Sequence, residues 1–325
     1  MKKLLALIII FLLLLFAGRG WWNNQGGSVS DDKVTRTVII AKGASVDDIA
    51  NQLQKEGLIK SPLIFKLLVK QKNMGEKIQA GTFKLSPAMS IEEVINALSG
   101  GAVEVWVTLI EGWRVEEMAQ ELSENLPAGK AGLKVKSEKF LTLAQEGYMF
   151  PDTYLFPNEI TEEQIVKMMR DHFDKKYSDD LKAKIRSKGL SEKEGVILAS
   201  IVEREARSDK VRTEVAGILL KRLSIDMGLN ADATIQYALG YQTDEKSWWK
   251  RHLTRDDLKV DSPYNTYIHR GLPPTPICNP SLSSLEAVAN TDPSTPYLYY
   301  YHDSKGNSHY GKTLEEHNEN VANNP

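Results

Sequence analysis

Near the middle of the chain runs Leu198-Ala199-Ser200-Ile201-Val202-Glu203-Arg204-Glu205-Ala206-Arg207-Ser208-Asp209-Lys210, in which an apolar segment ends abruptly on a carboxylate. Every residue from Val196 to Val202 except Ser200 is apolar, and none of them breaks a helix. An apolar run without the period of one exposed face is typical of a helix that is buried nearly all round. The sequence therefore predicts a core helix that ends at Glu203.

Glu203 is the first ionisable group at the end of this predicted helix. Apolar surroundings disfavour the charged form of a carboxyl, so we expect its pKa to be raised into the range of a general acid. The alternative is that Glu203 begins the solvated end of the helix and pairs with Arg207 one turn later; spacing alone favours this alternative. If the helix continues, Glu205 lies about 200° further round it, so both carboxylates cannot face one cleft, and Glu205 is interpreted as a surface or structural charge.

The overall composition is that of an ordinary globular protein. The 325 residues, 42% of them hydrophobic, are enough for about two domains with substantial cores. A formal net charge of −2 provides no basic footprint, so nucleic acid is not an expected partner. Cys278 is the only cysteine, which excludes an internal disulfide and a cysteine-based zinc cluster.

The N-terminus predicts an exported, membrane-anchored protein. Lys2 and Lys3 precede an apolar stretch from Leu4 to Ala17, which is shorter than the roughly 20 residues of a usual spanning helix. A cleaved signal peptide is therefore the alternative. No small-x-small cleavage site is obvious, and Trp21 and Trp22 favour the membrane interface, so we expect a retained single-pass anchor with its N-terminus in the cytoplasm.

A weak internal repeat follows a Gly/Ser-rich tether at residues 23–35. Each copy has an acidic pair in the first turn of a predicted helix, a position that suits the helix dipole. Each copy also follows an extended apolar run, at residues 37–41, 81–85 and 103–110. The copies are Ser45 to Leu53, Ser90 to Leu98 and Arg114 to Leu122.

Another helix is predicted over residues 58–71, which gives the order strand-helix-helix-strand from Thr37 to Leu85. This order resembles a LysM-like module, a fold associated with binding of glycan chains. The alternative is that repeated strand-helix units are common packing elements without a ligand.

The remainder of the chain predicts mainly helices. They cover residues 165–177, 180–188 and 211–223, while residues 127–136 form a surface excursion and four prolines between 273 and 280 enforce an extended loop. Tyr297 to Tyr301 favours a strand, followed by a turn at 303–307 and a second strand at 308–310. The predicted class is mixed α+β.

Three strings follow one another along the chain: Glu146-Gly147-Tyr148-Met149-Phe150-Pro151-Asp152-Thr153-Tyr154, then Ala199-Ser200-Ile201-Val202-Glu203-Arg204-Glu205, then Pro263-Tyr264-Asn265-Thr266-Tyr267 with Gly271-Leu272-Pro273-Pro274. The same strings occur in this order in the YceG-like (MltG) endolytic murein transglycosylases, and the chain resembles that family from the anchor to about Val321. The resemblance implies four parts: an anchor at 1–22, the tether at 23–35, a LysM-like subdomain at 36–101 and a catalytic domain at 102–325.

The resemblance also implies a reaction and a catalytic residue. Glu203 matches the catalytic acid of the family, which cuts β-1,4 bonds between MurNAc and GlcNAc within nascent peptidoglycan strands, beside the synthases. Ordinary glycosidases use two carboxylates, whereas only one carboxylate here has a convincing apolar setting. In a lytic transglycosylase the C6 hydroxyl of the muramic acid replaces water, so that one group serves as acid and then base and a 1,6-anhydro end is formed.

Polar and aromatic residues of the matched strings are candidates for substrate binding. They are Tyr148, Asp152 and Tyr154 from the first string, Asn265, Thr266 and Tyr267 from the last, and Asp232, Thr234 and Gln236 from a further family segment. Thr234 and Gln236 would project alike if that segment were extended. Each could instead be a core residue, a cap or a turn former. Ala233 departs from the family, in which a proline is expected at this position.

Other chemistries have weaker support. No Gly-x-Ser-x-Gly elbow is present for a serine hydrolase, and no glycine-rich phosphate loop or other cofactor motif occurs. His302, His309 and His317 lack the spacing of metal ligands and are expected to be surface groups. Two other functions stay open: a non-catalytic glycan-binding scaffold, and a muramidase that uses water. The formation of anhydro ends distinguishes all three.

Overall fold

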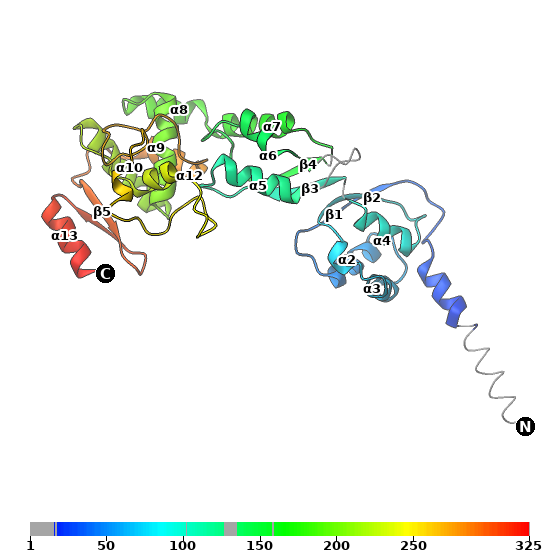
Figure 1. Ribbon diagram of the computed structural model, residues 1–325. Coiled ribbons are helices and arrows are strands. Elements are labelled where there is room, and N and C mark those ends of the chain that lie inside the picture. The colour runs from blue at the N-terminus through cyan, green and yellow to red at the C-terminus, as the bar shows by residue number, and fades with distance from the viewer. Residues whose placement is uncertain (1–15, 17, 102, 127–134, 158, 325) are drawn as a thin grey trace, which may run out of the picture. The chain divides into compact units, whose positions relative to one another are not determined.

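The computed structural model describes residues 16, 18–101, 103–126, 135–157 and 159–324, which form two compact units (Figure 1). Of the described residues, the first unit comprises those up to 107, together with 126, 154–157, 159 and 160. The second comprises 108–125, 135–153 and 161–324. The predicted mixed α+β class is confirmed, because both units combine strands with helices.

The first unit is built on a four-stranded sheet with the order β1-β2-β3-β4. Strands β1 and β2 are antiparallel, with Val38 opposite Phe83. Phe65 and Leu53, from two different helices, are fully buried in the core of this unit. The strands are β1 (Arg36–Ile40), β2 (Gly81–Leu85), β3 (Glu104–Thr108) and β4 (Thr153–Pro157), and the helices are α2 (Val46–Lys55), α3 (Pro62–Gln71), η1 (Gly75–Lys77) and α4 (Ile91–Ser99).

Local capping explains why the predicted helix starts are confirmed here. Ser45 and Ser90 each form a capping box, with Asp48 and Glu93 as the reciprocal partners. The order strand-helix-helix-strand is present from β1 to β2. Helix α3 begins at Pro62 rather than at Leu58, because the side chain of Ser61 caps it.

The second unit is centred on α9 (Glu192–Glu205), which packs against α8, α10, α11 and α12. Residues Gly195 to Val202 of α9 are buried, as the apolar run predicted. A Cβ atom on Gly195 would lie 2.6 Å from Ile185 of α8, so a glycine is required where these helices meet. The other elements are α5 (Val115–Asn125), α6 (Ser137–Leu143), α7 (Glu162–Lys176), α8 (Asp179–Ser187), α10 (Asp209–Ser224), α11 (Asp232–Leu239), η2 (Asp257–Lys259), α12 (Leu282–Asn290), β5 (Tyr299–His302), β6 (Ser308–Gly311) and α13 (Leu314–Asn323).

Two sequence predictions fall largely on residues that the structure does not describe. The predicted anchor, Leu4 to Ala17, lies outside the described residues except for Phe16, and so does most of the excursion at 127–136. Among the residues that are described, no helix combines the length and the apolar character needed to cross a membrane.

Candidate active site

A cavity of about 510 Å³ lies where the end of α9, the start of α10, helix α11 and the β5-β6 hairpin meet. Its wall carries carboxylates, arginines and small polar groups, which is the composition expected of a site for a polar ligand. The lining residues are Arg204, Glu205, Arg207, Ser208, Val211, Asp232, Ala233, Gln236, His302, Asp303, Ser304, Gly306 and Ser308.

Glu205 faces this cavity and has the environment of a general acid. Its Oε2 atom accepts a hydrogen bond from the Tyr300 hydroxyl at 3.1 Å, and its Oε1 atom accepts one from the Ala233 N–H at 3.4 Å. Burial, followed by the charge of Asp232, raises the pKa of Glu205 to about 7. The sequence interprets Glu205 as a surface or structural charge, and the surface alternative is wrong, because its carboxyl group is desolvated and lines a cavity.

Glu203 lies in different surroundings, among donors rather than apolar walls. Its Oε1 atom accepts from Nη2 of Arg212 at 2.9 Å, and its Oε2 atom accepts from the N–H of Ser281 at 2.8 Å and the hydroxyl of Ser284 at 2.7 Å. The Ser281 hydroxyl is a further donor to Oε2. Only 5% of the Glu203 side chain is exposed. The expected apolar setting and the expected pairing with Arg207 are both wrong.

These contacts give Glu203 a clear structural role. Ser281 is the N-cap residue of α12, and Arg212 belongs to α10. A carboxylate at a helix N-terminus is stabilised by the unpaired N–H groups and the helix dipole. Glu203 therefore ties α9 to α10 and α12, and it is not among the residues that line the cavity beside Glu205.

The helical geometry explains why the two carboxylates separate. Helix α9 continues through both residues, and positions two apart point about 200° from one another. One carboxylate reaches the start of α12, and the other reaches α11 and the β5-β6 hairpin. The prediction that both cannot face one cleft is confirmed, but the carboxylate that faces the cavity is Glu205.

The segment from Asp232 is the helix α11 and not an extended strand. Gln236 lines the cavity and donates to the Lys250 carbonyl at 2.7 Å, while Asp232 accepts from the Tyr267 hydroxyl at 2.6 Å. Thr234 is completely buried and bonds to the Ala231 carbonyl at 2.7 Å, so it does not project beside Gln236.

Asn265 and Thr266 are buried and hold the loop that presents Tyr267. The Asn265 amide donates to two backbone carbonyls of the preceding segment, Leu258 and Val260, at 3.1 and 2.8 Å. The Thr266 hydroxyl accepts the Ala231 N–H at 3.0 Å, next to the start of α11. The geometry therefore assigns both residues a supporting position.

None of the three candidates of the first string is among the residues that line the cavity. The Tyr148 ring packs edge-on against Phe173, with ring centroids 5.0 Å apart. Asp152 accepts the Thr153 N–H at 2.7 Å. Tyr154 is buried on β4 and belongs to the first unit.

Glu146, in the same string, is a desolvated carboxyl that the sequence did not single out. Burial raises its pKa to about 8, and Asn279 donates to its Oε1 atom at 2.9 Å. The amide oxygen of Asn279 also accepts the N–H groups of Gly147 and Met149, both at 2.9 Å. Asn279 is completely buried and fixes this loop.

Sequence reasoning also missed the partners that surround the two glutamates. Tyr300 was predicted only as part of a strand, and Arg212 and Ser281 were not assigned a role. The prediction that His302 and His309 are surface groups is wrong. His302 is half-buried and lines the cavity, and Nε2 of His309 lies 3.0 Å from Oδ2 of Asp303.

The tyrosine-rich stretch from Tyr297 to Tyr301 was the sequence signal that could have indicated Tyr300 as a partner of the site.

Comparisons with known proteins agree on one family. The model of the YceG-like family matches residues 38–323. The endolytic murein transglycosylase of Bacillus subtilis is 32% identical, over 89% of this chain and 84% of that protein. The enzyme of the same name from Streptococcus pneumoniae D39 is 31% identical over 88% of this chain, which spans 58% of that longer relative.

A solved structure agrees as well. The crystal structure of a YceG-like protein from Listeria monocytogenes has 30% identity and a TM-score of 0.65, over 88% of this chain and 99% of that one. The extent of these matches, together with the three ordered strings, places the chain in the YceG-like family.

Proposed function

We propose that this protein is a lytic transglycosylase that cuts within peptidoglycan strands and that Glu205 is its general acid and base. The names of the relatives support the reaction class. The observation that carries the residue assignment is the Glu205 carboxyl, which faces the cavity with its pKa raised to about 7. A carboxyl of this kind is protonated often enough near neutral pH to donate a proton.

The proposed reaction needs no water and no cofactor. Glu205 donates its proton to the oxygen of the β-1,4 bond between MurNAc and GlcNAc, and the bond from C1 of MurNAc to that oxygen breaks through an oxocarbenium-like state. The C6 hydroxyl of the same MurNAc then attacks C1 and returns its proton to Glu205. The products are a 1,6-anhydro-MurNAc end and a GlcNAc with a free 4-hydroxyl, and the acid is regenerated.

The competing assignment is Glu203, which the family resemblance favours. Its two oxygens are occupied by the guanidinium of Arg212 and by donors from Ser281 and Ser284. A general acid must carry a proton of its own. The carboxyl oxygens of Glu203 face four hydrogen-bond donors, and among these only the serine hydroxyls could also accept a hydrogen bond from a protonated Glu203. Glu205 has fewer donors and an open cavity beside it.

The two assignments are distinguished by two variants of the same helix. E205Q keeps the shape of the side chain but cannot deliver a proton, so cleavage of purified strands should fall by roughly 10²–10⁴. E203Q should keep the chemistry to the extent that the protein stays folded. Full activity of folded E205Q, with loss in folded E203Q, would restore the assignment to Glu203.

Mass spectrometry of the released fragments tests the reaction itself. We expect 1,6-anhydro ends from the wild type. Reducing MurNAc ends without anhydro products would replace this proposal with a muramidase, and binding without release of any fragment would favour a scaffold.

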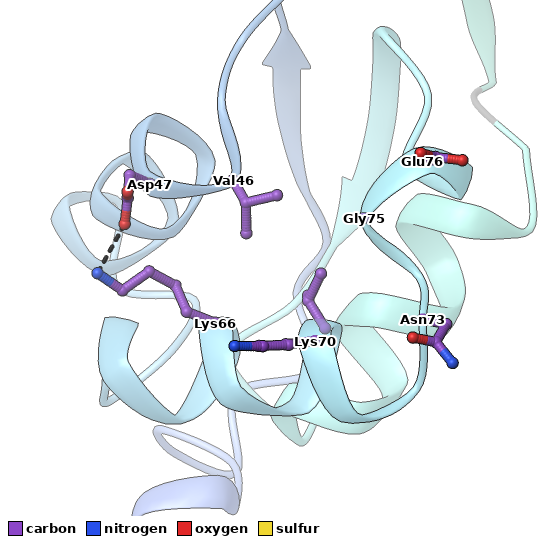
Figure 2. A pocket seen from close by; sticks show the side chains of 8 residues that line it. Val46, Asp47, Lys66, Lys70, Asn73, Gly75 and Glu76 are labelled. Atoms are coloured by element: carbon purple, nitrogen blue, oxygen red, sulfur yellow. Dashed lines mark ion pairs between the residues drawn. The ribbon is translucent and has the colours of Figure 1, made fainter.

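We also propose that the first unit contacts the glycan, as its LysM-like order of elements suggests. Figure 2 shows a pocket of about 550 Å³ in this unit, between the start of α2 and the end of α3. Its wall offers ammonium, carboxylate and amide groups that can bond to sugar hydroxyls; one ammonium, on Lys66, pairs with Asp47 at 2.6 Å. The lining residues are Val46, Asp47, Lys66, Val69, Lys70, Asn73, Gly75 and Glu76.

Binding of chitotetraose to the protein without its first 31 residues tests this contact. N73A combined with K70A should weaken binding several-fold, whereas K84A, an exposed lysine on β2, should not. Equal affinities in all three proteins would exclude a glycan contact in this pocket.

Finally, we propose that the Leu4 to Ala17 stretch anchors the protein in the plasma membrane, with the two units outside the cytoplasm, where peptidoglycan synthases work. The support is the apolar sequence with Lys2 and Lys3 before it and Trp21 and Trp22 after it. Full-length protein should fractionate with membranes. N-terminal sequencing that finds a mature start between Gly18 and Asn24 would contradict the retained anchor.

A further inference from the structure

We propose that Asp232 is a second functional carboxylate of the active site. Its negative charge, beside Glu205, stabilises the positive charge that develops on the sugar ring in the transition state. This inference rests on the proposed function, and it changes the expectation that a single carboxylate serves this site. It assigns Asp232 an electrostatic role and no covalent one.

The position of Asp232 is the first observation. Asp232 is the first residue of α11, directly before Ala233, whose N–H donates to Glu205. Both carboxylates line the same cavity. A substrate that reaches the proton of Glu205 therefore has the Asp232 carboxylate along the same wall.

The contrast between the two environments is the second observation. Asp232 is exposed to solvent and accepts a 2.6 Å hydrogen bond from the Tyr267 hydroxyl. The Glu205 carboxyl is desolvated, and its bond from Tyr300 is longer, at 3.1 Å. Two nearby carboxyls in unlike surroundings commonly divide into a proton donor and a charge stabiliser.

The electrostatic coupling between them agrees with this division. The charge of Asp232 is the largest cause after burial that raises the pKa of Glu205, and the charge of Arg204 opposes it. Arg207 and His302 also line the cavity, the Asp303 carboxylate is held by His309, and Arg222 lies near Tyr267 and Tyr300. Burial is the first cause that favours the protonated form of Glu205, and Asp232 is the neighbouring charge that adds most to it.

A merely structural role for Asp232 is the alternative. An acidic residue in the first turn stabilises a helix by about 0.3–1 kcal/mol through the helix dipole, and α11 has no side-chain cap from Ala231. Asp179 provides a matched control, because it is also an exposed aspartate at the first position of a helix in the same unit.

The experiment compares D232N with D179N in the otherwise intact protein, with strand cleavage followed from pH 5 to 9. We expect D232N to lower kcat by about 10²-fold, as for other lost transition-state charge partners, with little change in KM. The alkaline limb of its kcat/KM profile should move to lower pH, because the negative neighbour of Glu205 is gone. D232E should restore both, and D179N should match the wild type.

Several outcomes would overturn the inference. If D232N and D179N lose stability equally and both keep the wild-type kcat and pH limb, the role of Asp232 is only to stabilise the first turn of α11. Should D232N fail to fold, D232S provides the same comparison. If the wild type releases reducing ends and D232N releases none, the reaction is hydrolysis and Asp232 is the base that activates water. If E205Q, measured in parallel, keeps wild-type activity, the proposed function itself fails; if E205Q is inactive and D232N is normal, only this inference fails.

Discussion

Arg212 and Glu203 form an ion pair withdrawn from solvent, with 2.9 Å between Nη2 and Oε1 and only 12% and 5% of their side chains exposed. The pair joins the end of α9 to the first turns of α10, beside the cap of α12. Glu205, two residues later, forms no ion pair within the described part of the chain. The end of α9 therefore carries two glutamates in different surroundings: Glu203 is held in an ion pair, and Glu205 is desolvated.

This difference predicts unequal effects of two similar variants on stability. E203Q leaves the largely buried Arg212 guanidinium with the exposed Asp209, at 3.2 Å, as its remaining charged partner, beside a hydrogen bond to the Ser283 hydroxyl at 3.3 Å. Loss of one member of a buried pair costs about 3 kcal/mol or more, so urea denaturation should find a large fall in the free energy of unfolding. E205Q replaces a costly buried carboxyl and should be close to neutral. Equal stabilities for the two variants would contradict the structural role of Glu203.

Elements whose signals are local could be predicted from the sequence. Helices α2 and α4 were predicted at nearly the observed bounds because a serine and an acidic residue three positions later form a capping box at each start. No helix is predicted from the sequence at the position of α12, although the side chain of Ser281 caps it.

The environments of the two glutamates could not be predicted in the same way. Ser281 lies 78 residues along the chain from Glu203, and Tyr300 lies 95 residues from Glu205. Local spacing correctly indicated that the carboxylates face different ways. Which of them meets donors and which meets a cavity depends on segments that only the tertiary fold brings to α9.

The pH dependence of cleavage should report the acid. Because the pKa of Glu205 is raised to about 7, the protonated form prevails below that pH, and kcat/KM should fall as the pH rises through 7. E146Q is the control, since Glu146 is another carboxyl whose pKa is strongly raised, and the profile of E146Q should keep the same limb. A limb centred near 4.5 would mean that the catalytic carboxyl is well solvated.

Glu146 predicts a pH dependence of stability. Its pKa is about 8 in the folded protein and about 4.5 when unfolded, so the folded state holds an extra proton between these values. Stability should therefore fall as the pH rises from about 5 to 8. E146Q, whose amide oxygen can still accept from Asn279, should fall less steeply and be the more stable protein at pH 9. Parallel urea midpoints for the two proteins across this range would show that the carboxyl is not desolvated.

Ala233, where the family is expected to have proline, contacts the Glu205 carboxyl group. Its N–H donates to Oε1 of Glu205 at 3.4 Å, and this bond favours the charged carboxylate and lowers the pKa of Glu205. In A233P this donor is missing, while the ring is tolerated in the first turn of α11, where no bond to a residue four positions back uses the N–H. We expect the melting temperature to change by only a few degrees and the alkaline limb of the kcat/KM profile to move to higher pH. A233S keeps the N–H and should leave the limb in place. A limb that stays fixed in folded A233P would show that the Ala233 N–H does not tune the acid, and a limb that moves equally in A233S would trace the effect to the side chain instead.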